Sequence, residues 1–239
     1  MKMGKTQLVP DKWKILSGSM LKLIAVITMV IDHTAHYFVS TYTVLFSVAG
    51  HNIMLYPIMR GIGRMAFPLF SFLLVEGFIH TRNRLRYGAS LLIFALISEL
   101  PWNLVHTGTW FYSKQNVFFT LFLGFLALWA IEAFKKIPVL PVVSAAALAY
   151  IASLLKTDYS FFGVLFIVLL YGLRENEIIR PLTAFLLENH WWVFAAFIPI
   201  TLYNGKRGFV KGPVLKYAFY VFYPAHLLII YLLKYFVLA

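Results

Sequence analysis

Long apolar segments, separated by short stretches of turn residues and charge, follow one another along almost the whole sequence. About 20 consecutive apolar residues in a helix span the hydrocarbon core of a bilayer, and most of these segments approach that length. Their approximate ranges are 20–40, 57–79, 87–105, 117–134, 138–155, 160–173, 181–203 and 215–237. Only 13% of the 239 residues are charged and 61% are hydrophobic, whereas soluble domains are about 25% charged. The sequence therefore predicts an all-α, polytopic membrane bundle and excludes an ordinary soluble globule.

The basic residues form short clusters between the apolar segments. The net charge is +12, but a nucleic-acid binder gathers its Lys and Arg on one folded face, so we expect no nucleic-acid partner. Basic loops mark the cytoplasmic side of a membrane protein, which predicts a cytoplasmic N-terminus. The absence of cysteine excludes disulfides, thiolate metal sites and a cysteine nucleophile, and we expect no bound metal.

The basic cluster at 206–211 follows the inner loop at 174–180 after a single apolar segment, which breaks the alternation of crossings. Either the segment 181–203 turns back on itself or the positive-inside rule fails once. Glu188, Asn189 and His190 form a polar break between two short apolar arms, which favours a pair of half-helices. The expected architecture is one transmembrane domain over residues 1–239 with about nine passes, eight to ten being the range.

Ionisable side chains within the spanning segments are rare and expensive, and they commonly mark function. A rise of about 1.5 Å per residue places His33, Arg64, Glu99 and His226 at a similar depth. Taken singly, a membrane histidine is more often a hydrogen-bond partner and an arginine often reaches back to the interface. The common depth of these four side chains favours a functional site. Asp32 is next to His33 in the sequence, and Arg60 lies four residues before Arg64. Gly61 and Gly63 are small enough to let a neighbouring helix or a ligand approach the backbone beside Arg64.

Six runs of residues around these positions follow one another along the sequence: Met29-Val30-Ile31-Asp32-His33, Gly61-Ile62-Gly63-Arg64-Met65-Ala66-Phe67-Pro68, Ser98-Glu99-Leu100-Pro101, Gln115-Asn116-Val117-Phe118, Tyr203-Asn204-Gly205-Lys206-Arg207-Gly208 and Tyr223-Pro224-Ala225-His226. Together they resemble the TraX family of membrane acetyltransferases. The similarity runs in order from Leu21 to the last segment. One departure is Asp158-Tyr159-Ser160, where the family usually reads Asp-Tyr-Gly.

The resemblance implies transfer of an acetyl group from cytoplasmic acetyl-CoA to the N-terminal amine of a membrane-inserted pilin, in a bacterial cytoplasmic membrane. It carries over seven polar positions, namely Asp32, His33, Arg64, Glu99, Asn116, Asp158 and His226. The acceptor stays open, because a lipid or glycan hydroxyl at or beyond the membrane midplane is equally compatible with these residues.

Acyl transfer needs a base for the attacking group and a donor for the developing oxyanion. We expect His33 to be the base, with Glu99 or Asp158 orienting it or holding the acceptor, and Asp32 is a further expected catalytic residue to which the sequence assigns no role. Arg64 is expected to contact the thioester oxygen or the cofactor. The expected substrate contacts are Asn116, Asp158 and His226, and the expected cofactor contacts are Arg60, Arg64, Arg82, Lys206 and Arg207.

Two other classes of function fit part of this pattern. A proton-coupled secondary transporter also buries His, Asp and Arg near broken helices, although transporters usually carry internal repeats and none is visible here. A non-catalytic scaffold of a conjugation or secretion apparatus would not need His33 and Arg64 at a common depth.

Overall fold

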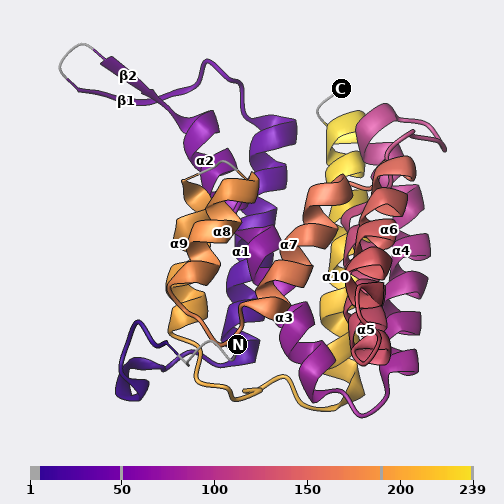
Figure 1. Cartoon of the computed structure of the whole chain (residues 1–239). Coiled ribbons are helices and arrows are strands. Elements are labelled where there is room, and N and C mark those ends of the chain that lie inside the picture. Colours follow the sequence, from indigo (N-terminus) through magenta and orange to yellow (C-terminus); the bar gives the residue numbers. More distant parts are fainter. Residues whose placement is uncertain (1–5, 49–50, 189–190, 238–239) are drawn as a thin grey trace.

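A computed structural model describes residues 6–48, 51–188 and 191–237 (Figure 1). Its elements, in chain order, are the 3₁₀ turn η1 (Asp11–Trp13), α1 (Gly18–Phe38), β1 (Val44–Val48), β2 (His51–Met54), α2 (Leu55–Gly63), α3 (Ala66–His80), α4 (Arg84–Thr107), α5 (Val117–Phe134), α6 (Leu140–Leu154), α7 (Ser160–Gly172), α8 (Ile179–Glu188), α9 (Trp192–Thr201), α10 (Gly212–Leu232) and the π-helical turn η2 (Leu233–Val237). Within the described residues the two strands form an antiparallel hairpin and the rest of the regular structure is helical.

The helices have the length and composition of a multi-pass membrane bundle. Five described helical segments are long and apolar enough to cross a bilayer: α1, the combined α2–α3 segment, α4, α5 and the combined α10–η2 segment. The helices α6, α7 and α9 are shorter and apolar. The predicted all-α membrane bundle is therefore confirmed.

The bundle has two ends that differ in charge. The N-terminal end of α1 and the α3–α4, α5–α6, α7–α8 and α9–α10 connections lie at one end, which we call the N-terminal face; the hairpin and the end of α10 lie at the other, the C-terminal face (Figure 1). The connections at the N-terminal face carry the basic clusters, which include Arg82, Lys135, Lys136, Arg174, Lys206, Arg207 and Lys211. This is the asymmetry that the sequence pattern predicts.

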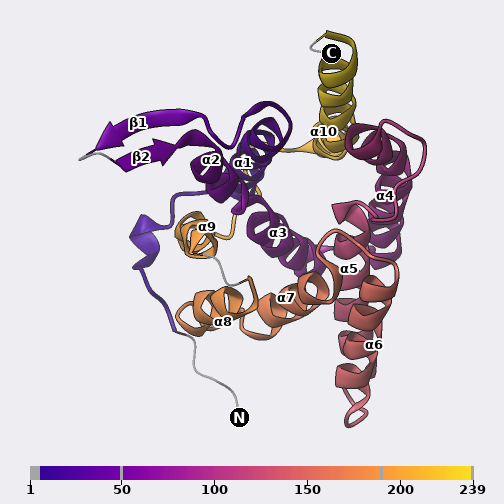
Figure 2. The ribbon, with the colours of Figure 1, turned by 90° about the horizontal axis from the view of Figure 1, so that it is seen from above.

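The helices α8 and α9 are short and lie side by side (Figures 1 and 2), as expected for two half-helices in the segment 181–203. Asn189 and His190, at the expected break, lie outside the described residues. Figure 2 also places α3 inside the bundle, where it packs against α1, α5, α7 and α9. A helix that is apolar all round is expected to be buried in this way.

The segment predicted as a single helix over 57–79 is broken between α2 and α3. Pro68 explains the break, because a proline has no backbone N–H to bond the carbonyl four residues earlier and its ring clashes with that carbonyl. The carbonyl in question belongs to Arg64, the C-cap of α2. A Cβ on Gly61 would overlap the Trp192 ring, and one on Gly63 would overlap the Asp32 side chain. Both glycines thus allow the close packing that the sequence indicated.

Candidate functional site

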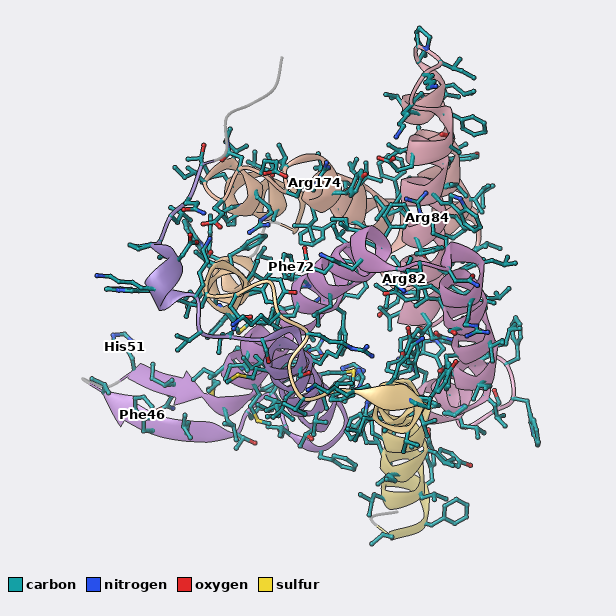
Figure 3. All side chains as sticks on the ribbon, turned by 90° about the horizontal axis from the view of Figure 1, so that it is seen from below. Phe46, His51, Phe72, Arg82, Arg84 and Arg174 are labelled. Atoms are coloured by element: carbon teal, nitrogen blue, oxygen red, sulfur yellow. The ribbon has the colours of Figure 1, made fainter. Side chains whose placement is uncertain are left out.

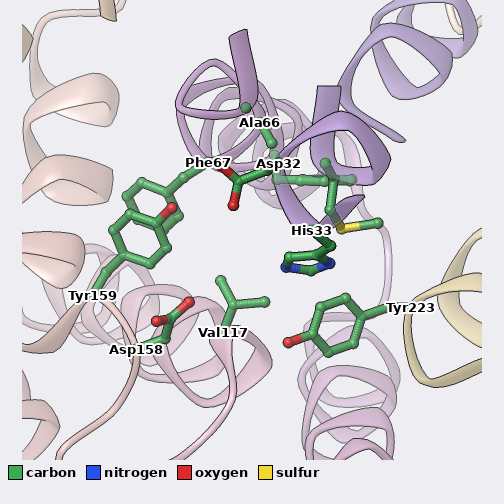
Figure 4. Close-up of a pocket in the computed structure, with 11 residues that line it drawn as sticks. Asp32, His33, Ala66, Phe67, Val117, Asp158, Tyr159 and Tyr223 are labelled. Atoms are coloured by element: carbon green, nitrogen blue, oxygen red, sulfur yellow. The ribbon is translucent and has the colours of Figure 1, made fainter. Parts of the chain in front are cut away.

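A small pocket lies at the junction of α1, the α2–α3 break, the first residue of α5, α10 and the α6–α7 loop (Figure 4). Its volume is about 60 Å³. The residues that line it are Met29, Asp32, His33, Gly63, Ala66, Phe67, Phe70, Val117, Asp158, Tyr159 and Tyr223. The rings of Phe67 and Tyr159 stack with their centroids 3.6 Å apart and form one wall. Three residues of the predicted site, Asp32, His33 and Asp158, thus meet in one pocket.

His33 is held by a second histidine behind the pocket. Its Nδ1 lies 2.6 Å from Nε2 of His226, and the ring planes are 6° apart. Nδ1 of His226 lies 3.0 Å from the carbonyl oxygen of Phe222. A carbonyl only accepts, so this nitrogen carries the proton, and in neutral His226 Nε2 is then an acceptor. His33 therefore donates from Nδ1, which leaves its Nε2 with a free lone pair.

Asp32 faces the pocket from α1. One carboxylate oxygen, Oδ2, accepts a hydrogen bond from the Arg60 guanidinium at 2.6 Å. The other, Oδ1, is buried and has no hydrogen-bond partner among the described residues. A buried carboxylate oxygen without a donor is costly, which makes it a ready acceptor for a ligand N–H or O–H.

Asp158 enters the pocket from the α6–α7 loop, on the side opposite to Asp32 (Figure 4). The residue is exposed to solvent although it lines the pocket. Desolvation by the protein around the carboxyl raises the pKa of Asp158 to about 6, and the positive charge of Arg64 opposes the shift. The pocket is therefore a place where two carboxylates and an imidazole face a common space.

Glu99 and Asn116 form a separate unit beside the pocket. Asn116 is the N-cap of α5, where its side-chain oxygen accepts from the Phe118 amide, and its side-chain NH₂ donates to Glu99 and to the carbonyl of Ala95. The pair lies outside the pocket lining. It fixes the first residue of α5, Val117, which does line the pocket.

A much larger cavity, of about 520 Å³, lies between the pocket and the N-terminal face. The two share the side chains of Met29, Phe70, Val117 and Tyr223. The deep end of the cavity therefore adjoins the His33 pocket, and these four side chains lie between the two. Toward the N-terminal face it is lined by four cations from different parts of the chain, Lys22, Arg86, Arg207 and Lys216, together with Glu76 and His80.

Only some of the residues predicted to contact the cofactor line the large cavity. Arg207 lines the cavity, whereas Lys206 and Arg82 do not. Arg82 and its neighbour Arg84 lie at the N-terminal face around the α3–α4 turn (Figure 3), where Arg84 covers the ring of Phe78. Arg60 does not line the cavity either, and its guanidinium donates a hydrogen bond to Asp32.

The turn around Lys206 and Arg207 is attached to the start of α1. Its carbonyl oxygens accept hydrogen bonds from Gly18 N at 2.8 Å and Ser19 N at 2.9 Å. Positive φ angles at Gly205 (74°) and Gly208 (84°) shape the turn, a conformation that favours glycine. The Lys206 amide is already bonded to the Asn204 side chain at 2.9 Å, so this part of the turn is an anchor.

Sequence reasoning missed several lining residues. Lys22 and Lys216 lie within or beside apolar segments, and a lysine in such a segment is itself a signal that could have found them. Tyr159 and Tyr223 gave no such signal, because aromatic residues occur throughout the spans.

Comparisons with known proteins show the family of the chain. The sequence model of the TraX family, described as "TraX protein", matches residues 17–234. The chain is also similar to the curated "Probable fimbrial assembly protein FimC, serogroup H1" of Dichelobacter nodosus, with 32% identity over 241 residues that cover 88% of this chain and 93% of the relative. No solved structure matches. On these two matches, the chain belongs to the TraX family.

Proposed function

We propose that this protein transfers an acetyl group from acetyl-CoA to the primary amine of a membrane-associated peptide, with the reaction taking place in the His33 pocket. The observation that carries the proposal is a large cavity that is lined by cations toward the N-terminal face and adjoins the His33 pocket at its deep end. A water-soluble, polyanionic donor and a membrane-bound acceptor would meet in such an arrangement.

The large cavity fits an acyl-CoA in charge and in depth. Lys22, Arg86, Arg207 and Lys216 would hold the phosphates of the nucleotide, since phosphate groups are bound best by several Lys and Arg side chains together. The deeper part of the cavity is lined by apolar and aromatic side chains such as Leu121 and Phe118, which suit the narrow pantetheine arm. The bound donor would supply an activated thioester carbonyl.

The two carboxylates favour an amine over a hydroxyl as the acceptor. A primary amine is protonated near neutral pH, and Asp32 and Asp158 face one another across the pocket where an ammonium would be stabilised by both. A hydroxyl would gain only one hydrogen bond from them. The unpaired Oδ1 of Asp32 is available for this contact.

In this proposal His33 acts as the general base through its free Nε2. The bound ammonium first gives up one proton to water, and the lone pair of the neutral amine then forms the N–C bond to the acetyl carbon. His33 takes a second proton from that nitrogen, the C–S bond breaks, and the departing sulfur takes a proton from the protonated His33. His226 is the positioning residue that keeps the His33 lone pair on Nε2. General-base assistance of this kind contributes about 10²–10⁴-fold in rate.

The family and the fimbrial name of the relative support a pilin-like peptide as the acceptor. The positive-inside rule supports a cytoplasmic N-terminal face in a bacterial cytoplasmic membrane, so that cytosolic acetyl-CoA would enter at the basic mouth of the cavity.

The proposal is tested with the purified protein in nanodiscs and acetyl-CoA. Released CoA is measured with a thiol reagent, to which the chain adds no background because it has no cysteine. A hydrophobic peptide with a free N-terminal amine should give CoA release and a product 42 Da heavier, about the mass of one acetyl group in place of hydrogen, whereas the same peptide with a blocked N-terminus should give neither. His33→Ala should abolish transfer while acetyl-CoA binding stays within a few-fold. Absence of acetyl-CoA binding by the wild-type protein would refute the proposal.

A further inference from the structure

The hairpin β1–β2 extends sideways from the bundle at the C-terminal face (Figures 1 and 2). It begins shortly after α1 ends and leads directly into α2, so its base lies at the level where two membrane helices meet the surface. In the view from below, Phe46 and His51 lie well away from the helices (Figure 3). Neither strand packs extensively against a described helix.

The hairpin is unusually apolar for a connection between helices. From Tyr37 to Met59 the sequence contains no Asp, Glu, Lys or Arg. Other connections of the bundle carry charge, for example Arg82 between α3 and α4 and Lys114 between α4 and α5. An uncharged connection is not what contact with water on all sides would favour.

The distal part of the hairpin has one apolar and one polar face. Residues directly opposite each other in an antiparallel pair share a face, and successive residues alternate. Phe46 pairs with Ile53 and Val48 pairs with His51, which we call the apolar face of the hairpin. Ser47 pairs with Asn52 on the polar face, where the Ser47 hydroxyl donates to Asn52 Oδ1 at 2.6 Å.

The apolar face is left uncovered by the described chain. Phe46 and Val48 keep 51% and 57% of their surface exposed. A two-stranded hairpin alone is marginally stable in water, and an exposed apolar strand with free edges invites aggregation. A surface that covers these residues would remove both problems.

We infer that the hairpin lies in the interfacial region of the lipid bilayer at the C-terminal face, with Phe46, Val48 and Ile53 against the acyl boundary and Ser47 and Asn52 toward water. Lipid is the occupant that the position favours, because the hairpin leaves the bundle where the spanning helices end. Its unpaired strand edges need water and exclude the hydrocarbon core, while aromatic side chains such as Phe46 and the neighbouring Tyr42 suit the boundary. Such an element would act as a lateral anchor for α1 and α2, both of which border the His33 pocket.

The natural absence of cysteine permits a direct test. Phe46→Cys and Ser47→Cys are adjacent and differ in the face that they occupy, so each is the matched control of the other. Each variant carries a nitroxide label in phosphatidylcholine nanodiscs, and the accessibility of the label to oxygen and to a water-soluble nickel chelate is measured. Ile229→Cys, on an exposed side of α10, and Trp110→Cys, in the α4–α5 loop, are the lipid and water references.

The ratio of oxygen to nickel accessibility should be several-fold higher at position 46 than at position 47. The ratio at 46 should be near that of the lipid reference at 229, and the ratio at 47 near that of the water reference at 110. Val48→Cys and Asn52→Cys should repeat the contrast. Equal ratios at positions 46 and 47, or water-like ratios at both, would overturn the inference, the second result indicating a surface free for a protein partner. Unchanged thermal unfolding of each labelled variant verifies that the hairpin is compared in the folded protein.

Discussion

The Nδ1 atom of His33 and the Nε2 atom of His226 lie 2.6 Å apart, although 193 residues separate them in the chain. His226 is fixed in turn by the Phe222 carbonyl. This chain of hydrogen bonds sets which nitrogen of His33 is free, in the way that a second residue commonly fixes the tautomer of a functional histidine. His226 therefore has a defined part in the proposed chemistry without touching the pocket.

We expect His226→Leu to lower kcat by about 10–100-fold, the cost known for losing the hydrogen-bond partner of a metal-bound histidine, with little change in KM for acetyl-CoA. His226→Gln should keep more activity, because its amide oxygen still accepts from His33 Nδ1. Nitrogen NMR of the protein labelled at histidine should show His33 protonated at Nδ1 in the wild type and as a mixture of tautomers in His226→Leu. His36→Leu, on the same helix as His33, is the control. Equal activity of the Leu and Gln variants would contradict the positioning role.

A second prediction concerns pH. The pKa of Asp158 is raised by burial to about 6, against the opposing charge of Arg64, so the group is neutral below that pH and anionic above it. An ammonium acceptor is held only by the anion, and KM for the amine should therefore fall as the pH rises through about 6. Asp158→Asn should raise KM and remove this dependence. A dependence that persists in Asp158→Asn would assign it to another group.

The same shift has a consequence for stability. A carboxyl with a raised folded-state pKa favours the protonated form in the folded protein, so its contribution to stability is largest at low pH and is lost as the pH rises toward about 6. Asp158→Asn should accordingly raise the midpoint of thermal unfolding above that pH. Differential scanning measurements at acid and neutral pH compare the two proteins.

The spans and their depth were predictable because a bilayer requires each segment to satisfy its own backbone hydrogen bonds. Segment length then gives the helices, and the rise per residue gives depth. His33 and Glu99 are each fifteen residues beyond the first residue of their helices, at about 22 Å, and His226 is at about 21 Å. The sequence does not show how each helix is rotated about its axis or which helices pack next to it. It could not show that Glu99 faces Asn116 rather than the pocket.

The β-hairpin was also absent from the sequence prediction. An apolar segment pattern finds helices that cross the membrane, and a short uncharged connection between two of them reads as a loop. The pairing of Ser47 with Asn52 depends on the register of two short strands, which hydrophobic length does not encode. The α2–α3 break was signalled by Pro68, but its position mattered only once the neighbouring helices were known.

Gly63 provides a test of the packing at the pocket. A Cβ at this position would overlap the Asp32 side chain, and overpacking of this kind typically costs about 1–3 kcal/mol. Gly63→Ala should therefore lower the free energy of unfolding by that amount and weaken transfer by displacing Asp32. Gly172→Ala is the matched control, since its Cβ meets nothing within 4 Å. Unfolding in mixed detergent micelles measures both, and equal stability of the two variants would argue against the close approach.

The orientation of the chain is tested with single cysteines in spheroplasts. Positions 83, 135 and 208, all in connections at the N-terminal face, should react with a membrane-impermeant maleimide only after the membrane is opened. Position 110, in the α4–α5 loop, should react in intact spheroplasts. Basic connections are retained on the cytoplasmic side, which is the reason for the expectation. Reaction at 83 in intact spheroplasts would place the basic mouth of the cavity on the wrong side for cytosolic acetyl-CoA.

A comparison of variants at Arg207 and Lys206 tests whether this turn binds a ligand or has only a structural role. Arg207 lines the large cavity and Lys206 does not, although both carry the same charge at the same face. Arg207→Gln should raise KM for acetyl-CoA about 10-fold, a loss of roughly 1.4 kcal/mol that is in the range of one charged hydrogen bond, with kcat nearly unchanged because a phosphate contact is equal in the ground and transition states. Lys206→Gln should leave KM close to wild type.

A shortened donor makes this comparison specific to the nucleotide. Acetyl-pantetheine has the same thioester and lacks the nucleotide phosphates, so Arg207→Gln should scarcely change its KM. Lys216→Gln, which also lines the mouth, should behave like Arg207→Gln with both donors. Equal losses with acetyl-CoA and acetyl-pantetheine would mean that Arg207 acts through the turn that holds Gly18 and Ser19 of α1. The phosphates would then have to be bound by Lys22 and Arg86, two other cations that line the cavity.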